Sequence, residues 1–242
     1  MKNPAIDAII YSVNLLKDKA IAMADEPAKD AAIESPARME PMLPREGERR
    51  LEESAVELVS RASALAGNLN DAVQRSMGEL VRSMNCYYSN LIEGHDTHPR
   101  DIDRALARDY SAEPRRRALQ FEAVAHIDVQ QRIDEGKDEQ GEAASTKYIL
   151  WLHREFCQRL PEELLWVENP DTHIRIRVRP GVLREGDVAV GRHVPPSANS
   201  LPAFMARFEE AYGSSHLSKL RKIIAVAAAH HRLAHVCGIH AG

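Results

Sequence analysis

Apolar residues recur at intervals of three and four along most of this chain, which is the spacing of one face of an α-helix. The pattern predicts amphipathic helices that glycines and charged runs interrupt. Their expected ranges are 49–66, 71–93, 99–108, 114–135 and 145–159. A further helix is expected from Ser200, with Pro202 in its first turn, to Tyr212 before Gly213. The chain is therefore expected to be mostly α.

The last predicted helix spans about 216–236 and contains the run IIAVAAA at 223–229, which is apolar on nearly every side. Such a helix belongs in the centre of a bundle rather than on its surface. A helix buried on all sides needs neighbours on all sides, but only six residues follow it in this sequence. We therefore expect a helical bundle that lacks its last core helices, which leaves apolar surface of 216–236 exposed and prone to association.

One segment, HIRIRVRPGVLREGDVAVG, departs from the helical period. Ile174, Ile176 and Val178 alternate with arginines, a turn follows near Pro180–Gly181 or Gly186, and Val188 and Val190 alternate again. This alternation predicts one β-hairpin at 172–192. The alternating arginines could bind an acidic protein or a nucleic acid, but no aromatic residues interleave to stack bases, so a solvated face is favoured.

The N-terminal region differs from the rest in composition. Residues 1–24 have apolar positions at a helical period, and residues 25–48 carry four prolines among mixed charges, which is typical of a linker. We therefore divide the chain into an N-terminal helix and linker, an N-terminal helical region and a C-terminal region with the hairpin. Their ranges are 1–48, 49–135 and 136–242.

Charge and cysteine content narrow the function classes. Lys and Arg number 32 against 36 Asp and Glu, so no overall basic field attracts nucleic acid or an anionic membrane. Cys86, Cys157 and Cys237 are far apart and form no CxxC motif, which indicates reduced thiols. Asp7 and the charged run 17–19 interrupt the first apolar stretch, so it is neither a signal peptide nor a membrane span. A cytoplasmic protein without nucleic-acid or membrane partners is expected.

Candidate chemistry appears in the stretch YYSNLIEGHDTHPRDI, residues 87–102. On a helical wheel of about 100° per residue, Ser89 and Glu93 lie one turn apart, opposite the apolar stripe, and Gly94 ends the helix. The stripe is expected to face the core and consists of Val73, Met77, Leu80, Val81, Met84, Tyr88 and Leu91. By themselves, Ser89 and Glu93 fit either a solvated face or a pair that meets a ligand across a gap.

This stretch resembles the inhibitory helix of the Fic family, enzymes that typically transfer AMP from ATP to a protein hydroxyl. The segment GVLREGDVAVGRHVPPSANSLPAFMARFEEAY resembles that family's flap and the helix after it, and IIAVAAAHHRLAHV resembles the helix that leads into the catalytic loop. The three segments follow the family order from about Glu48 to Val236. The resemblance implies a Fic-type helical bundle with an inhibitory helix at 71–94 and the hairpin as its flap.

The resemblance also implies site residues and partners. Ser89, Glu93 and Gly94 correspond to the autoinhibitory motif at the nucleotide site. A protein substrate would dock on the flap as an extended segment, by main-chain pairing. The flap positions are Val188, Ala189, Val190, Gly191 and His193. The family uses ATP and Mg²⁺.

The family's catalytic loop, of the type HPFxxGNGRxxR, is not found in this sequence. In that loop a histidine takes the proton of the attacking hydroxyl, glycines let backbone N–H groups hold phosphates, and an acidic residue, where present, holds Mg²⁺. Here Val236 is followed by CGIHAG. We therefore assign no catalytic residue and expect the chain to be inactive, without productive binding of ATP and Mg²⁺.

Two other functions stay open on the sequence. The chain can be a non-enzymatic protein-interaction module that binds through the flap hairpin or an exposed helical groove. A metal-binding helix is less favoured, because the i,i+4 pair His231 and His235 needs further ligands and no separate group supplies them, so no metal site is assigned. The sequence also leaves a homo-oligomer open.

Overall fold

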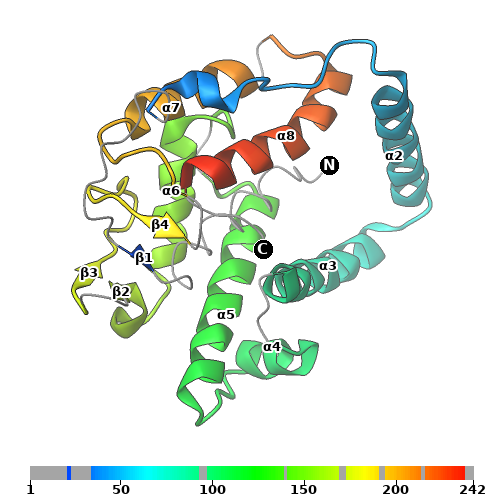
Figure 1. The fold of residues 1–242 in the computed structure, drawn as a ribbon. Helices are drawn as coiled ribbons and strands as arrows, with labels where there is room; N and C mark the ends of the chain where they lie inside the picture. Colours follow the sequence, from blue (N-terminus) through cyan, green and yellow to red (C-terminus); the bar gives the residue numbers. More distant parts are fainter. Residues whose placement is uncertain are drawn as a thin grey trace.

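The computed structural model describes residues 21–22, 34–92, 97–138, 141–168, 173–190, 194–213 and 216–237. Figure 1 shows a mostly helical molecule in which α5 (Pro114–Asp134) is central. It packs against α3 (Asp71–Ile92), α4 (Pro99–Leu106) and α6 (Thr146–Cys157). Helix α8 (Lys219–Cys237) packs against α7 (Leu201–Tyr212) and α2 (Arg49–Gly67). The predicted mostly α class is confirmed.

The helix boundaries agree with the sequence signals to within a few residues, because local capping sets them. The Glu113 carboxylate accepts hydrogen bonds from the backbone N–H groups of Arg115 and Arg116 at the start of α5, which lowers its pKa. Ser145 accepts from the Tyr148 N–H at the start of α6. Across the described ranges, no helix combines the length and the apolar character that crossing a membrane requires.

The main core lies between α5, α6, α7 and α8 and includes the fully buried side chains Phe156, Phe204 and Phe208. Helix α8 contributes one face, whose buried residues are Ala225, Ala229, Leu233 and Val236. Ile223 and Ile224, outside this face, are only partly buried, which agrees with the expectation that part of the apolar surface of 216–236 is exposed. Alanines in the buried face let α8 approach its neighbours closely on one side.

Residues 34–48, which we call the strap, pack on this core, although a linker was expected there. The strap contains the short 3₁₀ helix η1 (Pro36–Met39), and Met39 and Met42 are buried in the main core. The Tyr212 hydroxyl donates to the Met42 carbonyl at 2.6 Å, and Arg232 donates to the Pro41 carbonyl at 2.8 Å. Two methionine side chains and these carbonyl contacts thus order a segment whose composition suggested a linker.

The strands form two small antiparallel sheets. Strand β2 (Trp166–Glu168) pairs with β3 (Arg175–Arg177), with Val167 opposite Ile176. Strand β4 (Ala189–Val190) pairs instead with β1 (Ile21–Ala22) from the N-terminal region. An antiparallel hairpin is therefore present, but the expected pairing of 174–178 with 188–190 is wrong.

Contacts made by the chain between β3 and β4 explain why these two strands do not pair with each other. Gly181 has a positive φ of 76° and lies against α6, where its N–H donates to His153 Nδ1 at 3.1 Å. The chain then leaves β3 instead of returning along it. Residues 184–187 are held by residues 196–198, so β4 presents its edge to another part of the chain.

Helices α2 and α3, which we call the arm, extend from the body formed by α5–α8 (Figure 1). Helix α3 is attached to α5 by the Arg82–Asp134 ion pair at 2.6 Å and by a small cluster in which Cys86 meets Ala123 and Ile127. The apolar stripe of α3 lies on the other side, where Leu80 is 62% exposed. The expectation that this stripe faces the core is wrong, because the small Cys86 side chain permits closer packing on the opposite side.

Candidate functional site

The C-terminal end of α3 carries the first predicted site residue. Ser89 is half-buried and lies on the side of the helix that carries Arg82 and Cys86, which contact α5. It thus faces the body of the protein, opposite the exposed stripe. Glu93 and Gly94 lie outside the described residues, so their predicted role remains a prediction.

Buried polar atoms are found on both sides of this motif in the sequence. Asn90 Nδ2 and Thr97 Oγ1 are buried and, within the described ranges, have no hydrogen-bond partner. Buried polar groups in folded proteins nearly always have a partner, so each exception needs an explanation. An amide that can donate and a hydroxyl that can donate or accept therefore remain available beside residues 93–96.

His126 of α5 is a further buried polar residue that the sequence analysis did not identify. It is 1% exposed, and neither ring nitrogen has a hydrogen-bond partner among the residues that the structure describes. Burial lowers its pKa from 6.5 to about 4, so the ring is neutral at pH 7. The signal for it was a single polar residue between the apolar positions Ala123 and Ile127 of a predicted helix.

The cysteines and histidines do not form a reactive centre in the described part of the chain. Burial raises the pKa of the Cys86 thiol to about 12, so it is not a thiolate nucleophile at neutral pH. No three His, Cys, Asp or Glu side chains of the described ranges are grouped as metal ligands. His231 is exposed, with Nδ1 2.9 Å from an Arg232 guanidinium nitrogen. His240 and the Cys237 side chain lie outside the described residues.

The flap carries the second group of predicted site residues. Val188 is half-buried, and the backbones of Ala189 and Val190 form β4. Gly191 and His193 lie outside the described residues. In the β1–β4 pair, Ile21 is opposite Val190 and Ala22 is opposite Ala189. An extended segment of the same chain thus occupies this edge by main-chain pairing.

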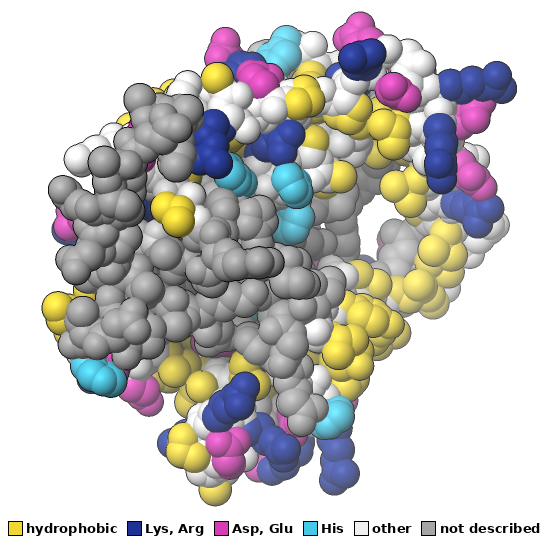
Figure 2. Space-filling model, in the orientation of Figure 1, with side chains coloured by type: hydrophobic (Ala, Val, Ile, Leu, Met, Phe, Trp, Pro, Cys, Tyr) yellow, Lys and Arg dark blue, Asp and Glu magenta, His cyan; other side chains and the backbone are white. Residues whose placement is uncertain are grey.

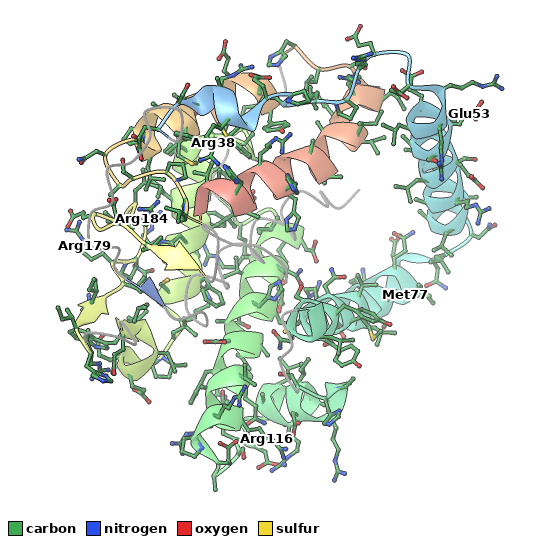
Figure 3. The ribbon with its side chains drawn as sticks, in the orientation of Figure 1. Arg38, Glu53, Met77, Arg116, Arg179 and Arg184 are labelled. Atoms are coloured by element: carbon green, nitrogen blue, oxygen red, sulfur yellow. The ribbon has the colours of Figure 1, made fainter. Side chains whose placement is uncertain are left out.

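Polar contacts fix the base of β4. The Ala198 N–H donates to Asp187 at 2.8 Å, and Arg184 donates to the carbonyls of Gly186, at 2.9 Å, and of Pro196. Figure 3 shows Arg184 on the flap side of the molecule, far from Met77 on the arm. The edge of β4 is therefore held in place relative to α7.

Glu34, the first residue of the strap, connects the strap to the segment just before α7. Its carboxylate accepts hydrogen bonds from the Ser197 hydroxyl at 2.6 Å, from the Ser197 N–H at 3.2 Å and from the Ser200 hydroxyl. A single acidic residue within the proline-rich residues 25–48 gave no sequence signal for this role. The contact joins residues that are more than 160 positions apart in the chain.

The arginines of the predicted hairpin are engaged by neighbouring side chains. Arg177 forms a bidentate pair with Glu162 at 2.7 and 2.9 Å, and Arg179 pairs with Glu185. The Arg175 guanidinium lies 5.3 Å from the centre of the Trp166 ring. Carboxylates therefore offset part of the positive charge on this face.

The chain is similar over most of its length to curated proteins named Protein adenylyltransferase Fic. It is 27% identical to the Drosophila virilis protein over 222 residues, which is 89% of this chain and 40% of that relative. The Drosophila melanogaster protein is 27% identical over 224 residues, with the same shares of both chains. The Drosophila persimilis protein is 32% identical over 109 residues, 43% of this chain and 20% of the relative.

The chain thus spans about two fifths of the length of the curated relatives that it matches over most of its own length. No protein-family model matches it, and no solved structure matches it significantly.

Proposed function

We propose that residues 1–242 belong to the Fic family and form the regulatory and target-docking part of a protein adenylyltransferase. The observation that carries this proposal is the similarity to proteins of that name over 89% of the chain. The mostly helical fold with an antiparallel hairpin is compatible with it. In this proposal each segment of the chain has a role in AMP transfer to a protein hydroxyl.

In this proposal α3 is the brake of the transferase. Ser89 lies on the body-facing side of α3, and Glu93 follows it by four positions in the sequence. The family resemblance assigns Glu93 and Gly94 to the inhibitory motif at the nucleotide site. The Glu93 carboxylate then opposes the γ-phosphate of ATP by charge and by occupying its place.

The catalytic step itself needs groups that residues 1–242 do not contain. No HPFxxGNGR-type motif is present in the sequence, so no base, phosphate cradle or Mg²⁺ ligand can be assigned. ATP and Mg²⁺ are accordingly proposed for the complete catalytic assembly and not for these residues alone. We expect no AMP transfer when residues 1–242 are incubated with labelled ATP and Mg²⁺.

A chimera tests the proposal directly. Residues 1–236 are joined to the segment of an active family member that begins at its HPFxxGNGR-type loop, and transfer of labelled AMP to protein is measured. We expect weak transfer that Glu93→Gly increases, because the substitution removes the carboxylate that opposes the γ-phosphate.

Two matched variants control this experiment. Glu79→Gly changes an exposed glutamate on the same helix and should not increase transfer. Replacing the histidine of the grafted loop should abolish it. A folded chimera that transfers AMP equally with and without Glu93 would contradict the brake, and one that transfers none in either form would contradict the family assignment.

The second candidate function is a non-enzymatic interaction module, and the pairing of β1 with β4 favours it. This edge already accepts an extended segment through its backbone, which is how edge strands bind peptides with little dependence on sequence. In both functions the docking positions are Val188, Ala189, Val190, Gly191 and His193.

Removal of residues 1–30 tests the docking edge. The truncated chain should bind an extended peptide with the sequence of residues 18–26 more tightly than the full chain does, as measured by fluorescence anisotropy. Val190→Pro removes a backbone donor from β4 and should weaken that binding. Equal peptide affinity of the full and truncated chains would exclude this edge as the docking site.

A further inference from the structure

A cluster of arginines lies at the end of the molecule where α4 meets the start of α5, and the proposed function does not use it. This cluster, which we call the arginine corner, consists of the exposed residues Arg100, Arg108, Arg115, Arg116 and Arg117. Figure 2 shows Lys and Arg side chains gathered at this end, and Figure 3 places Arg116 there. Across the described ranges, none of the five guanidinium groups forms a hydrogen bond or an ion pair with another side chain.

Most acidic residues between the start of α4 and the first turn of α5 are already engaged within the fold. Asp109 accepts two hydrogen bonds from Arg104, at 2.7 and 3.1 Å. The Glu113 carboxylate caps α5, and Asp101 is buried. In this described segment Asp103 is left to offset five arginines. The corner therefore carries positive charge that the fold does not neutralise.

Buried contacts fix the backbone of the corner. Gln120 of α5 is fully buried, its amide donates to the Asp101 carbonyl at 3.0 Å, and its oxygen accepts from the Ser111 N–H at 2.7 Å. The Tyr110 ring stacks on Phe121 with ring centres 4.4 Å apart. The loop between α4 and α5 is thereby held on α5. A surface whose backbone is already ordered loses less conformational entropy when it binds a partner.

Arg108 occupies a position where glycine is usual. The end of α4 is a Schellman motif, in which the Asp109 N–H donates to the Arg104 carbonyl at 2.8 Å and the Arg108 N–H donates to the Ala105 carbonyl at 2.9 Å. The residue after the cap of this motif is left-handed, and Arg108 has a φ of 60°. Glycine adopts this conformation at lower cost than a residue with a side chain. An arginine here indicates that its charge serves a purpose other than folding.

The chemistry of the corner favours an acidic protein segment as its partner. Guanidinium groups bind carboxylates through two parallel hydrogen bonds. Single-stranded nucleic acid binds to exposed aromatic rings, but Tyr110 is half-buried and stacked on Phe121. A membrane or a nucleic-acid duplex extends beyond the corner and meets a chain with a net charge of -4. A short run of Asp and Glu contacts the corner without covering the rest of the protein.

We propose that the arginine corner binds a short acidic segment of a partner protein. Arg116 lies one turn before Gln120 on the same side of α5, so it is close to the loop that carries Arg108. These two arginines and the neighbouring Arg117 form the centre of the site, with Arg100 and Arg115 at its edges. Their side chains bind carboxylates of the segment, and the ordered backbone beneath them sets the spacing.

Fluorescence anisotropy with a fluorescein-labelled polyglutamate peptide tests the site on the whole chain. The peptide should bind saturably, and a polyglutamine peptide of equal length should not. Arg116→Glu combined with Arg117→Glu reverses two charges and should lower the affinity at least about tenfold. Both residues are exposed, so the variant should keep its helical circular-dichroism signal. Arg108→Gly should also weaken binding but should not lower the melting temperature, because glycine accepts the left-handed φ without strain.

The matched control combines Arg50→Glu with Arg75→Glu, which changes the net charge equally at exposed arginines of the arm. At physiological salt this control should bind polyglutamate within about twofold of the wild type, since charges farther away than about 8 Å are screened. Absence of saturable binding, or equal losses in the two double variants, would overturn the proposal. Tighter binding of phosphatidylserine vesicles or of a short DNA duplex than of polyglutamate would overturn it as well. These measurements use no nucleotide, so they are independent of AMP transfer.

Discussion

Leu152 of α6 and Leu65 of α2 are chemically identical, but the body buries the first and the arm leaves the second half exposed. Around Leu152, three other helices and the strap contribute side chains to one continuous core. The second half of α2 and the first half of α3 are exposed on nearly every side. The comparison teaches that an apolar helical pattern shows which face seeks burial, whereas only the surroundings show whether that burial occurs within one chain.

The largest effect expected within this comparison is for the two leucines themselves. Leu152→Ala should lower the free energy of unfolding by about 3–5 kcal/mol, because it removes buried contacts and leaves a cavity. Leu65→Ala should change it by less than about 0.5 kcal/mol, because the side chain is half exposed. Urea unfolding of both variants measures the difference. Equal losses would contradict the division into a packed body and an exposed arm.

Acid should destabilise the body through His126. Its pKa is about 4 in the folded chain and 6.5 for the free side chain, so the unfolded state binds the proton more readily. Stability is complete above pH 6.5 and falls as the pH decreases to 4, by about 3 kcal/mol in total, since each pKa unit corresponds to about 1.4 kcal/mol.

His126→Leu removes this titration. The free energy of unfolding of this variant, measured by urea titration at several pH values, should change much less than that of the wild type between pH 6.5 and 4. At pH 7 the variant should be at least as stable, because it removes an unpartnered polar ring from the interior. Parallel pH curves for the two proteins would contradict the assignment of acid sensitivity to His126.

The strap should behave as part of the body. Met39 is fully buried, so Met39→Ala should cost about 2–3 kcal/mol in unfolding free energy, with some loss recovered when the short segment moves inward. Leu43→Ala, at a partly buried position of the strap, is the control and should cost less. If Met39→Ala has no effect on urea unfolding, the strap is not part of the cooperative unit.

The smallest effect is expected for the surface contact between strap and α7. Arg207 donates to Glu40 at 3.0 Å and lowers the pKa of that carboxyl. Glu40→Gln should cost less than about 0.5 kcal/mol, since both side chains are about one third exposed or more and solvent screens the pair. The ion pair stabilises the folded chain above the ordinary carboxyl pKa of 4.5, and this stabilisation is lost as the pH falls below that value. If Glu40→Gln lowers the free energy of unfolding equally at low and high salt, the pair is not screened by solvent as proposed.

The sequence predicted the helices because their periodicity, proline starts and caps act locally. It did not predict which elements the helices pack against. The helical wheel identified the apolar stripe of α3, but it does not show that the opposite face, which carries Cys86, packs against α5. The strap was missed because two methionines among prolines and charges give little signal. The pairing of β4 depended on residues far away in the sequence.

The sequence predicted part of the local structure around the candidate site residues. The wheel correctly separated Ser89 from the exposed stripe, and the alternating pattern located the strand that contains Ala189 and Val190. His126 and Glu34 were missed, because one depends on burial between packed helices and the other on a contact with Ser197 across the fold. Glu93, Gly94, Gly191 and His193 remain predictions.

The hydrogen bond between Glu34 and Ser197 has a consequence for the entropy of the chain. Ala22 and Ala189 are paired across a long stretch of sequence, and closing so large a loop for a two-residue ladder is unfavourable. Once Glu34 is bound to Ser197, only about 20 residues of chain remain to be closed. Residues 21–22 are then held near β4 at an effective concentration in the millimolar range, which any external peptide must exceed to take their place.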